Sequence, residues 1–411
     1  MTARSLRRAL TGFVVAATAA GAFTATAPAA SAASAAPAGG RDHRATQEVM
    51  DAEVAAGVPG VLGQARERVQ DRTVTWNGSS GVADLNTGRP RLPEDRFRVG
   101  SISKVFASVV LLQLEAEGRL SLDDTVESRL PGVLRGNGGH DGRHVTIRQL
   151  LNHSSGIYNY TEDEDVKKFL STEFMERRFE TRTPRQLVDV ALRHEPYFEP
   201  GTDFHYSNTN YILAGMIVEK VTGRPYATEI TQRVIRRAGL RATTFPGTSP
   251  AMPNPHGRAY SKLLKTEPDA KTYDVTELNP SWGGAAGAII STTGDLNRFY
   301  NVLLSGRLLP EKQQRELLTT IPMGKGSPAG YGLGIMSATL SCGVTVFSHS
   351  GGIHGSTSLV VSDEKGGHTA AFNYNGDWHA DLVSLVQAEY CGPAKPTGAA
   401  RDTLNKLTAL R

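Results

Sequence analysis

The sequence predicts an α/β (α+β) fold in which both ends of the chain build one antiparallel sheet and a block of helices is inserted between them. β-prone runs separated by turn-like clusters occur near each end, whereas residues 119–285 have the texture of helices and loops. We therefore expect a sheet part at about 46–118 and 286–395 and a helical part at about 119–285. A functional site is expected where the two parts meet.

The N-terminal part begins with a short amphipathic run, Thr46–Ala56, that predicts a helix. Residues 61–68 and 73–81 are short β-prone segments around a charged turn, which predicts a hairpin. Residues 105–114 are apolar on nearly every side, and a helix of that kind is buried. Gly118 is the expected stop of this helix.

Four further helices are predicted from apolar residues at helical spacing or from terminal signals. Thr183 and Pro184 are a helix start, with Thr as the N-cap and Pro in the first turn. Gly223 and Gly306 end two others. The expected helices begin near Thr146 and Thr183 and carry apolar stripes over 212–221 and 296–304.

The C-terminal part returns to strands. Residues 344–347, 356–362 and 368–374 are β-prone, and the last two runs are joined by a turn-like cluster at 363–367. Residues 381–390 predict a closing helix. These strands would complete the sheet begun near the N-terminus.

The first residues are predicted to be a secretory signal peptide covering 1–32. Three arginines precede an alanine-rich apolar run at 9–27, and Ala30-Ser31-Ala32 offers a small-x-small cleavage site. The alternative, a membrane anchor, is disfavoured because the run is poor in Leu and Ile and breaks at Pro28. We expect a secreted, extracellular protein without a stable membrane anchor.

After this segment the chain reads as a linker at 33–45, a body at 46–395 and a tail at 396–411. The chain has two cysteines, Cys342 and Cys391. In an exported protein such a pair favours one disulfide, and two independent thiols are the alternative.

The composition of the 411 residues, 39% hydrophobic and 21% charged, is that of a soluble globular protein. Residues 1–32 hold three arginines and no acidic residue, so their removal lowers the formal charge from +4 to +1. No basic stripe suggests nucleic acid. We expect a monomer without a nucleic-acid partner.

Ser101 and Lys104 are the first candidates for chemistry. If a helix starts at Ser101, residues three apart lie on one face, one turn from each other. A buried lysine tends to lose its proton, and a neutral amine can take the proton of a serine hydroxyl and leave a nucleophile. Ser-x-x-Lys is a common pattern, and the chain has a second copy at Ser362–Lys365 in a predicted turn.

Tyr206 and Asn208 form the only Tyr-x-Asn in the chain. A tyrosine can shuttle a proton if a cation such as Lys104 lowers its pKa. An asparagine can hydrogen-bond both a lysine and a substrate amide. The structural alternative is a polar loop that caps a helix, because Ser and Asn are good caps.

His349-Ser350-Gly351-Gly352 follows at the expected end of the 344–348 strand. A polar pair followed by glycines lets a substrate backbone approach closely. A bend before the next strand is the structural alternative, and a loose match also occurs at His140-Asp141-Gly142.

Taken in order, these three motifs resemble those of the serine penicillin-recognising family, which includes D-alanyl-D-alanine carboxypeptidases, class C β-lactamases and related esterases. The histidine in the third motif resembles the secreted carboxypeptidases of this group more than the class C β-lactamases, which usually have Lys-Thr-Gly there. The resemblance covers about 46–395, includes the cysteine pair, and implies a β-lactamase/transpeptidase-like fold. Further similar stretches are 97–101, 150–156, 206–215, 282–287 and 330–334.

The resemblance implies an acyl-enzyme mechanism in which Ser101 attacks and Lys104 and Tyr206 handle protons. The N–H groups of Ser101 and Gly352 would form the oxyanion hole. The remaining assignments implied are Asn208 and Trp282 bordering the substrate, His349 with Ser350 in proton relay and docking, and Gly351 with Gly352 against the substrate backbone. No metal or cofactor is implied, and the expected partners are peptidoglycan stem peptides or β-lactams.

One departure concerns the substrate's terminal carboxylate. The related carboxypeptidases place an arginine just after the Gly-Tyr-Gly-Leu-Gly stretch, where residues 335–339 here contain no cation, and Gly352 stands where a hydroxyl residue is common. His354 is a partial substitute to consider. The prediction is a secreted D-alanyl-D-alanine carboxypeptidase; the alternatives are an esterase or β-lactamase on the same scaffold, or a non-catalytic peptidoglycan-binding module.

Overall fold

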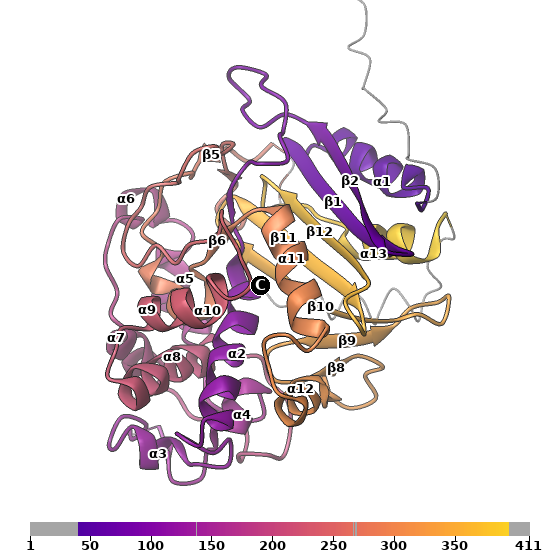
Figure 1. Ribbon diagram of the computed structural model, residues 1–411. Coiled ribbons are helices and arrows are strands. Elements are labelled where there is room, and N and C mark those ends of the chain that lie inside the picture. The colour runs from indigo at the N-terminus through magenta and orange to yellow at the C-terminus, as the bar shows by residue number, and fades with distance from the viewer. Residues whose placement is uncertain (1–39, 137, 266, 268, 394–411) are drawn as a thin grey trace, which may run out of the picture. The chain divides into compact units, whose positions relative to one another are not determined.

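The computed structural model describes residues 40–393 except 137, 266 and 268, all within the compact unit Pro37–Arg411 (Figure 1). The predicted signal peptide, most of the predicted linker and the predicted tail lie outside the described residues. The division of the chain into the predicted domains stays a prediction. Mixed α/β architecture with one large antiparallel sheet is confirmed.

Eight antiparallel strands form the main sheet in the order β2-β1-β12-β11-β10-β9-β8-β7, so the two ends of the chain meet where β1 pairs with β12. The hairpin and the three C-terminal strands predicted from sequence are confirmed. The strand bounds are β1 Gly60–Val69, β2 Arg72–Gly81, β7 Ile321–Pro322, β8 Gly330–Tyr331, β9 Met336–Thr339, β10 Thr345–Ile353, β11 Ser356–Asp363 and β12 His368–Tyr374. Two short pairs lie outside it, β3 Phe97–Arg98 with β6 Ile290–Ser291 and β4 Tyr260–Ser261 with β5 Tyr273–Asp274.

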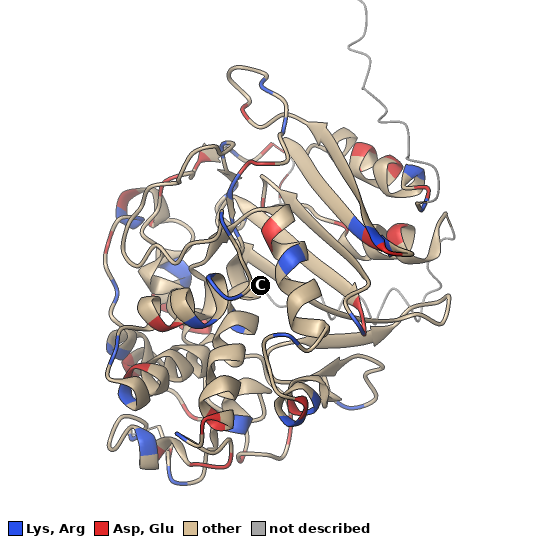
Figure 2. Ribbon diagram, in the orientation of Figure 1, with Lys and Arg blue, Asp and Glu red and all other residues tan. Residues whose placement is uncertain are grey.

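Helices cover both faces of this sheet (Figure 1). Successive side chains of a strand point to opposite faces, so Leu359 and Val361 of β11 join the cluster under α1 (Arg44–Ala55) and α13 (Leu382–Cys391), whereas Val360 joins the cluster under α11 (Thr293–Leu304). The central strands are therefore buried on both sides and carry few charged residues. Most charged residues lie on the outer helices and loops (Figure 2).

Helix α2 (Ser103–Ala116) lies in the core shared by the sheet and the helical part. Every residue from Ser103 to Leu114 is buried, as the run of mostly apolar residues at 105–114 predicts. The chain leaves the helix through Gly118, which has a left-handed φ of 68°. This burial fixes the N-terminal turn of α2 between the two parts of the fold.

The helices between α2 and the C-terminal strands are short except α8 and α11. Thr146 and Thr183 form capping boxes with Gln149 and Gln186, which satisfies the first N–H groups of α4 and α7 and confirms both predicted starts. The bounds are α3 Val126–Arg129, α4 Ile147–Leu151, α5 Glu164–Phe169, α6 Phe174–Arg177, α7 Pro184–Ala191, α8 Asn208–Thr222, α9 Tyr226–Ile230, α10 Gly284–Gly287 and α12 Glu311–Leu318. Single turns occur at Gly100–Ile102, Tyr160–Glu162, Thr231–Ile235 and Pro280–Trp282.

Two sequence predictions need correction. The first helix begins at Arg44 rather than Thr46, inside the predicted linker. The strand predicted to end near 348 continues to Ile353, because residues 349–353 keep pairing with β11. Glycine alone does not end a strand whose neighbour supplies the hydrogen bonds. His349 and its neighbours thus lie inside β10 and not at its end.

Cys342 and Cys391 form the predicted disulfide, with Cα atoms 5.7 Å apart. The bond links the turn before β10 to the last residue of α13. No helix among residues 40–393, the three masked positions apart, is both long and apolar enough to cross a bilayer.

Candidate active site

Ser101 lies in the single 3₁₀ turn Gly100–Ile102 that leads directly into α2. This turn is packed tightly against β10. A side chain at Gly351 would place its Cβ 1.9 Å from the Val99 carbonyl oxygen, and one at Gly100, whose φ is 54°, would lie 2.8 Å from the Gly352 nitrogen. The backbone of β10 and the serine turn lie so close together that the third motif requires glycine there. This close approach places the N–H of Gly352 beside the serine turn.

Lys104 is fully buried one turn beyond Ser101, as the spacing predicts. Its Nζ is 2.9 Å from Ser101 Oγ, 2.8 Å from Asn208 Oδ1 and 2.9 Å from the Ala286 carbonyl oxygen. Burial lowers the pKa of Lys104 well below its ordinary value. A neutral amine has two N–H groups, which the amide and carbonyl oxygens accept, and a lone pair that is left for the Ser101 hydroxyl proton.

Tyr206 stands beside this pair, with its ring centroid 4.8 Å from Lys104 Nζ. The sequence-based expectation of a lowered tyrosine pKa is wrong: burial raises the pKa of Tyr206 well above its ordinary value, and the Ser101 hydroxyl opposes only part of that rise. The buried hydroxyl forms no hydrogen bond of ordinary geometry within the described part of the chain. Tyr206 is therefore a neutral phenol that can donate and accept a proton but does not rest as a phenolate.

His349 is fully buried behind this group and does not line the pocket at Ser101. Its Nδ1–H donates to the Ser350 carbonyl at 2.5 Å, and its Nε2 accepts from the Tyr331 hydroxyl at 2.9 Å. Burial, aided by nearby Lys104, lowers the pKa of His349 to about 3. With both ring nitrogens occupied, His349 holds neighbouring groups in place and does not face a substrate; its predicted catalytic role stays a prediction.

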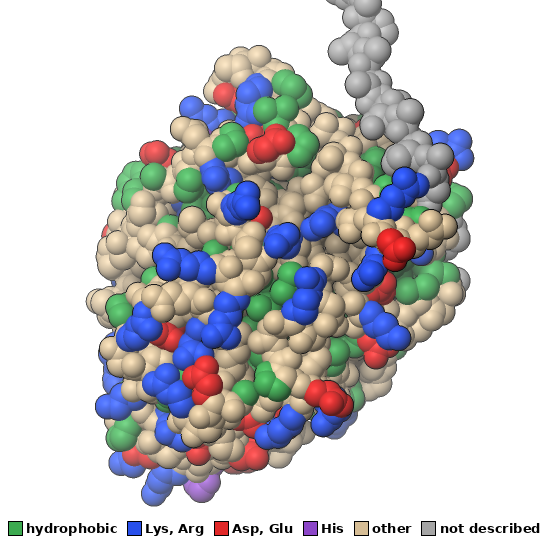
Figure 3. Space-filling view, viewed as in Figure 1, with side chains coloured by type: hydrophobic (Ala, Val, Ile, Leu, Met, Phe, Trp, Pro, Cys, Tyr) green, Lys and Arg blue, Asp and Glu red, His purple; other side chains and the backbone are tan. Residues whose placement is uncertain are grey.

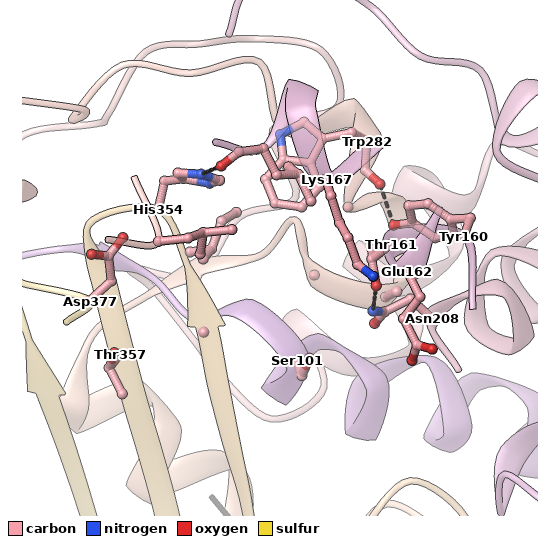
Figure 4. Close-up of a pocket in the computed structure, with 17 residues that line it drawn as sticks. Ser101, Tyr160, Thr161, Glu162, Lys167, Asn208, Trp282, His354, Thr357 and Asp377 are labelled. Atoms are coloured by element: carbon pink, nitrogen blue, oxygen red, sulfur yellow. Dashed lines mark hydrogen bonds between the residues drawn. The ribbon is translucent and has the colours of Figure 1, made fainter. Parts of the chain in front are cut away.

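A pocket of about 310 Å³ opens over Ser101 (Figure 4). Asn208, Trp282 and Gly352 line it, as expected for substrate-bordering residues. Ser350 and Gly351 are buried in β10 and do not line it, because Gly351 is pressed against the serine turn. The Asn208 amide group also donates to Thr161 Oγ1 at 3.3 Å, which fixes the orientation of the oxygen that Lys104 uses.

Charged residues that sequence reasoning missed line the same pocket. Glu162 and Asp377 lie on opposite sides of it, and the Lys167 side chain from α5 extends toward Thr161 and Asn208 (Figure 4). Burial alone would raise the pKa of Glu162, but hydrogen bonds from His205, Tyr197 and Asn159 lower it to about 2. The pocket therefore contains a permanently ionised carboxylate. No local motif marks these residues: Glu162 lies in the turn Tyr160–Glu162, Lys167 in α5, and Asp377 after β12.

His354 also lines the pocket, but it does not supply the missing cation. Its Nε2–H donates to the Leu170 carbonyl at 2.6 Å and its ring stacks on Phe174 with centroids 3.6 Å apart. Burial lowers the pKa of His354, so the ring is neutral. The suggestion that His354 partly substitutes for the carboxylate-binding arginine stays a prediction.

His153 is a further residue of the site whose place the sequence did not reveal. Its backbone has a left-handed φ of 62°, and its Nδ1 accepts from the Ser207 N–H at 3.2 Å and from Asn210 Nδ2 at 3.1 Å. Its ring lies on the Tyr206 ring, with centroids 4.2 Å apart. The sequence pointed to His153 only through its position in the 150–156 stretch, which is similar to the serine penicillin-recognising family.

Comparison with known protein families shows which family this chain belongs to. A family model described as Beta-lactamase matches residues 47–385, which is most of the chain. The chain belongs to the beta-lactamase family. The Ser101–Lys104 pair at the base of a pocket agrees with a family of serine hydrolases, and the fold is the β-lactamase/transpeptidase fold expected from the resemblance.

The chain is similar to three proteins with names that indicate their activity or ligand. A D-stereospecific amidohydrolase from Streptomyces sp. is 52% identical, with a TM-score of 0.81, and the match covers 86% of this chain and 100% of that chain. A D-amino acid amidase from Ochrobactrum anthropi SV3, complexed with L-phenylalanine, is 27% identical at a TM-score of 0.71 over 84% of this chain and 96% of that chain. Penicillin-binding protein 4* of Bacillus subtilis (strain 168) is 28% identical over 70% of this chain, and this chain spans 62% of its length.

On the face seen in Figure 3, basic and acidic side chains are scattered and form no continuous basic stripe of the kind that binds nucleic acid. Across the described residues, no group of three or more His, Cys, Asp or Glu side chains is placed to hold a metal ion. The expected monomer stays a prediction.

Proposed function

We propose that this protein is a serine amidohydrolase that cleaves amides and peptides of D-amino acids through an acyl-enzyme. The carrying observation is the contact of Lys104 Nζ with Ser101 Oγ at 2.9 Å beneath a largely apolar pocket. The 52% identity to a D-stereospecific amidohydrolase supports the stereochemical preference.

The proposed first half-reaction forms an ester between Ser101 Oγ and the substrate carbonyl carbon. The Ser101 proton passes to neutral Lys104 Nζ, and a proton relayed through Tyr206 reaches the leaving nitrogen as the C–N bond breaks. Backbone N–H groups of Ser101 and Gly352 would stabilise the negative oxygen. In the second half-reaction, water attacks the ester and Ser101 regains its proton.

The pocket lining supports an apolar D-aminoacyl group that carries a free ammonium. Leu170, Trp282 and Ile353 offer apolar surface, and the ionised Glu162 supplies a counter-charge for an α-ammonium. We propose secretion as well, on the grounds of the N-terminal segment and the disulfide, which is rare in reducing compartments.

A second candidate is the D-alanyl-D-alanine carboxypeptidase predicted from the motifs. The observation that favours it is Lys167, a cation at the pocket that has no ion-pair partner within the described part of the chain. A lysine could hold a terminal carboxylate as a point charge, although without the bidentate geometry of an arginine. Stem peptides of peptidoglycan would then be the substrates.

The deciding experiment compares D-phenylalanine amide, L-phenylalanine amide and diacetyl-Lys-D-Ala-D-Ala, with p-nitrophenyl acetate as an ester probe. We expect ammonia release from the D-amide at least about tenfold faster than from the L-amide, and complete loss of release in Ser101→Ala. The control is Lys365→Met, which removes the lysine of the second Ser-x-x-Lys and should leave activity unchanged.

Other outcomes are equally informative. Release of D-alanine without amide hydrolysis would establish the carboxypeptidase, and hydrolysis of the ester alone would establish an esterase. Labelling by a fluorescent penicillin that disappears in Ser101→Ala would show the acyl-enzyme chemistry whichever substrate is preferred. Activity that survives Ser101→Ala would overturn the proposed nucleophile.

A further inference from the structure

A second, much smaller cavity lies beside the substrate pocket and is lined by arginines. It has a volume of about 20 Å³. Four arginines line it, Arg91, Arg96, Arg98 and Arg258, and no Asp or Glu is among the described residues that do so. A cavity of this size holds one water molecule or one monoatomic ion, and it is too small for a phosphate.

Two of these guanidinium groups are buried and only partly hydrogen-bonded. Arg98 is 4% exposed, and its Nη2 donates to the carbonyls of Pro250 at 2.8 Å and Leu278 at 3.1 Å. Its Nε and Nη1 have no partner within the described part of the chain, and neither does Nε of Arg91. Buried N–H groups are almost always satisfied, so three orphaned donors on two residues that line one cavity indicate a missing acceptor.

The positive charge here is only partly compensated. Arg258 pairs with Asp84 at 3.9 Å and with Asp274 at 3.4 Å. Arg98 forms no ion pair within residues 40–393, the three masked positions apart, although the Glu277 carboxylate acts on it from a greater distance. The carboxylate nearest to Arg91 is that of Asp95, 3.9 Å from Nε, and it already accepts from Arg89 Nη2 at 3.0 Å. Burial lowers the pKa of Arg98 only to about 10, so the group keeps its charge at neutral pH. An isolated buried charge is costly unless a counter-ion or hydrogen bonds offset it.

We propose that this cavity is a binding site for one small monoatomic anion of halide size, with Arg98 and Arg91 as its ligands. An anion can accept from all three orphaned donors and offsets the unpaired charge of Arg98, whereas a water oxygen accepts from at most two donors and leaves that charge. The assignment is independent of the substrate proposed above.

The site is connected to the catalytic turn through short covalent and hydrogen-bonded paths. Arg98 ends β3 three residues before Ser101, and its carbonyl accepts from Ser356 Oγ of β11 at 2.7 Å. His354 lines both the anion cavity and the substrate pocket. Occupancy should therefore stabilise β3, which leads into the turn that carries Ser101, and the adjoining pocket wall.

The test uses the full mature chain exchanged into sodium methanesulfonate and titrated with sodium chloride or bromide at constant ionic strength. We expect Tm to rise saturably by more than about 1 °C with either halide and not with sulfate. Arg98→Met should abolish the response, while Arg185→Met, which removes an exposed arginine on α7 paired with Asp189, should retain it.

A crystal of the wild-type protein grown in bromide gives a readout that does not depend on a variant folding. An anomalous peak between Arg91 and Arg98 would establish the anion. No anomalous peak, together with equal Tm values in all four salts, would mean that the cavity holds water only and would overturn the proposal.

Discussion

The His153 ring lies against the Tyr206 ring, with centroids 4.2 Å apart, while its Nδ1 accepts from the backbone N–H of Ser207. One residue thereby holds both the ring of Tyr206 and the backbone that follows it. Burial, with Lys104 and His349 nearby, holds the pKa of His153 well below its ordinary value, which favours a neutral ring, and the two donors at Nδ1 leave the ring proton on Nε2.

We therefore predict that His153 is a positioning residue. His153→Leu leaves the N–H groups of Ser207 and Asn210 without an acceptor, at about 1–3 kcal/mol for each orphaned donor. We expect kcat to fall by about tenfold or more with KM nearly unchanged. His153→Asn retains an acceptor and tolerates the left-handed backbone, so it should recover part of kcat. Equal loss in both variants would argue for a purely structural role.

The second prediction concerns the buried amine. Because the folded-state pKa of Lys104 is lowered, the unfolded chain binds more protons between that value and the ordinary value of 10.5. The free energy of unfolding should rise with pH in this window, by at most about 1.4 kcal/mol per pH unit from this group. Urea unfolding of wild type and Lys104→Met at pH 7, 8 and 9 isolates the contribution.

We expect the wild type to gain stability relative to Lys104→Met as pH increases. Lys365→Met, at an exposed lysine in the β11–β12 turn, is the control and should show a constant difference. A constant difference for Lys104→Met as well would mean that Lys104 is protonated in the folded protein and cannot act as the base.

The third prediction addresses the ionised carboxylate at the pocket. Glu162→Gln should lower kcat/KM for D-phenylalanine amide by about tenfold, about 1.4 kcal/mol, which is a part of the about 4 kcal/mol by which two unit charges about 4 Å apart near a protein surface interact at most. The N-acetylated amide has no ammonium and should change less than about twofold. An equal fall in kcat/KM for both substrates would show that Glu162 shapes the pocket and does not bind the substrate ammonium group.

The fourth prediction concerns the disulfide. Replacing both Cys342 and Cys391 by serine frees a loop closed over a sequence separation of 49 residues, which should lower the free energy of unfolding by about 2–4 kcal/mol. The bond does not line the pocket, so kcat at low temperature should stay unchanged. Reduction of the wild type with dithiothreitol should reproduce the shift, and an unaltered Tm in both experiments would contradict it.

The sequence by itself determined the N-terminal hairpin, the three C-terminal strands, the longer helices and the reacting pair. Ser101 and Lys104 are three apart just before a mostly apolar run, so local helical geometry alone places them within hydrogen-bond reach. Thr183, Pro184 and Gly223 are terminal signals that act over one turn, and they set helix ends without tertiary help.

Only the tertiary structure decided what depends on distant residues. The pKa of Tyr206 follows from burial, which no neighbour in sequence reveals, and the expectation based on Lys104 alone had the wrong sign. β10 passes the predicted end because β11 pairs with it, and Glu162, Lys167 and Asp377 meet at one pocket from separate segments. Such contacts depend on packing between elements far apart in the chain, whereas motifs record only neighbours along it.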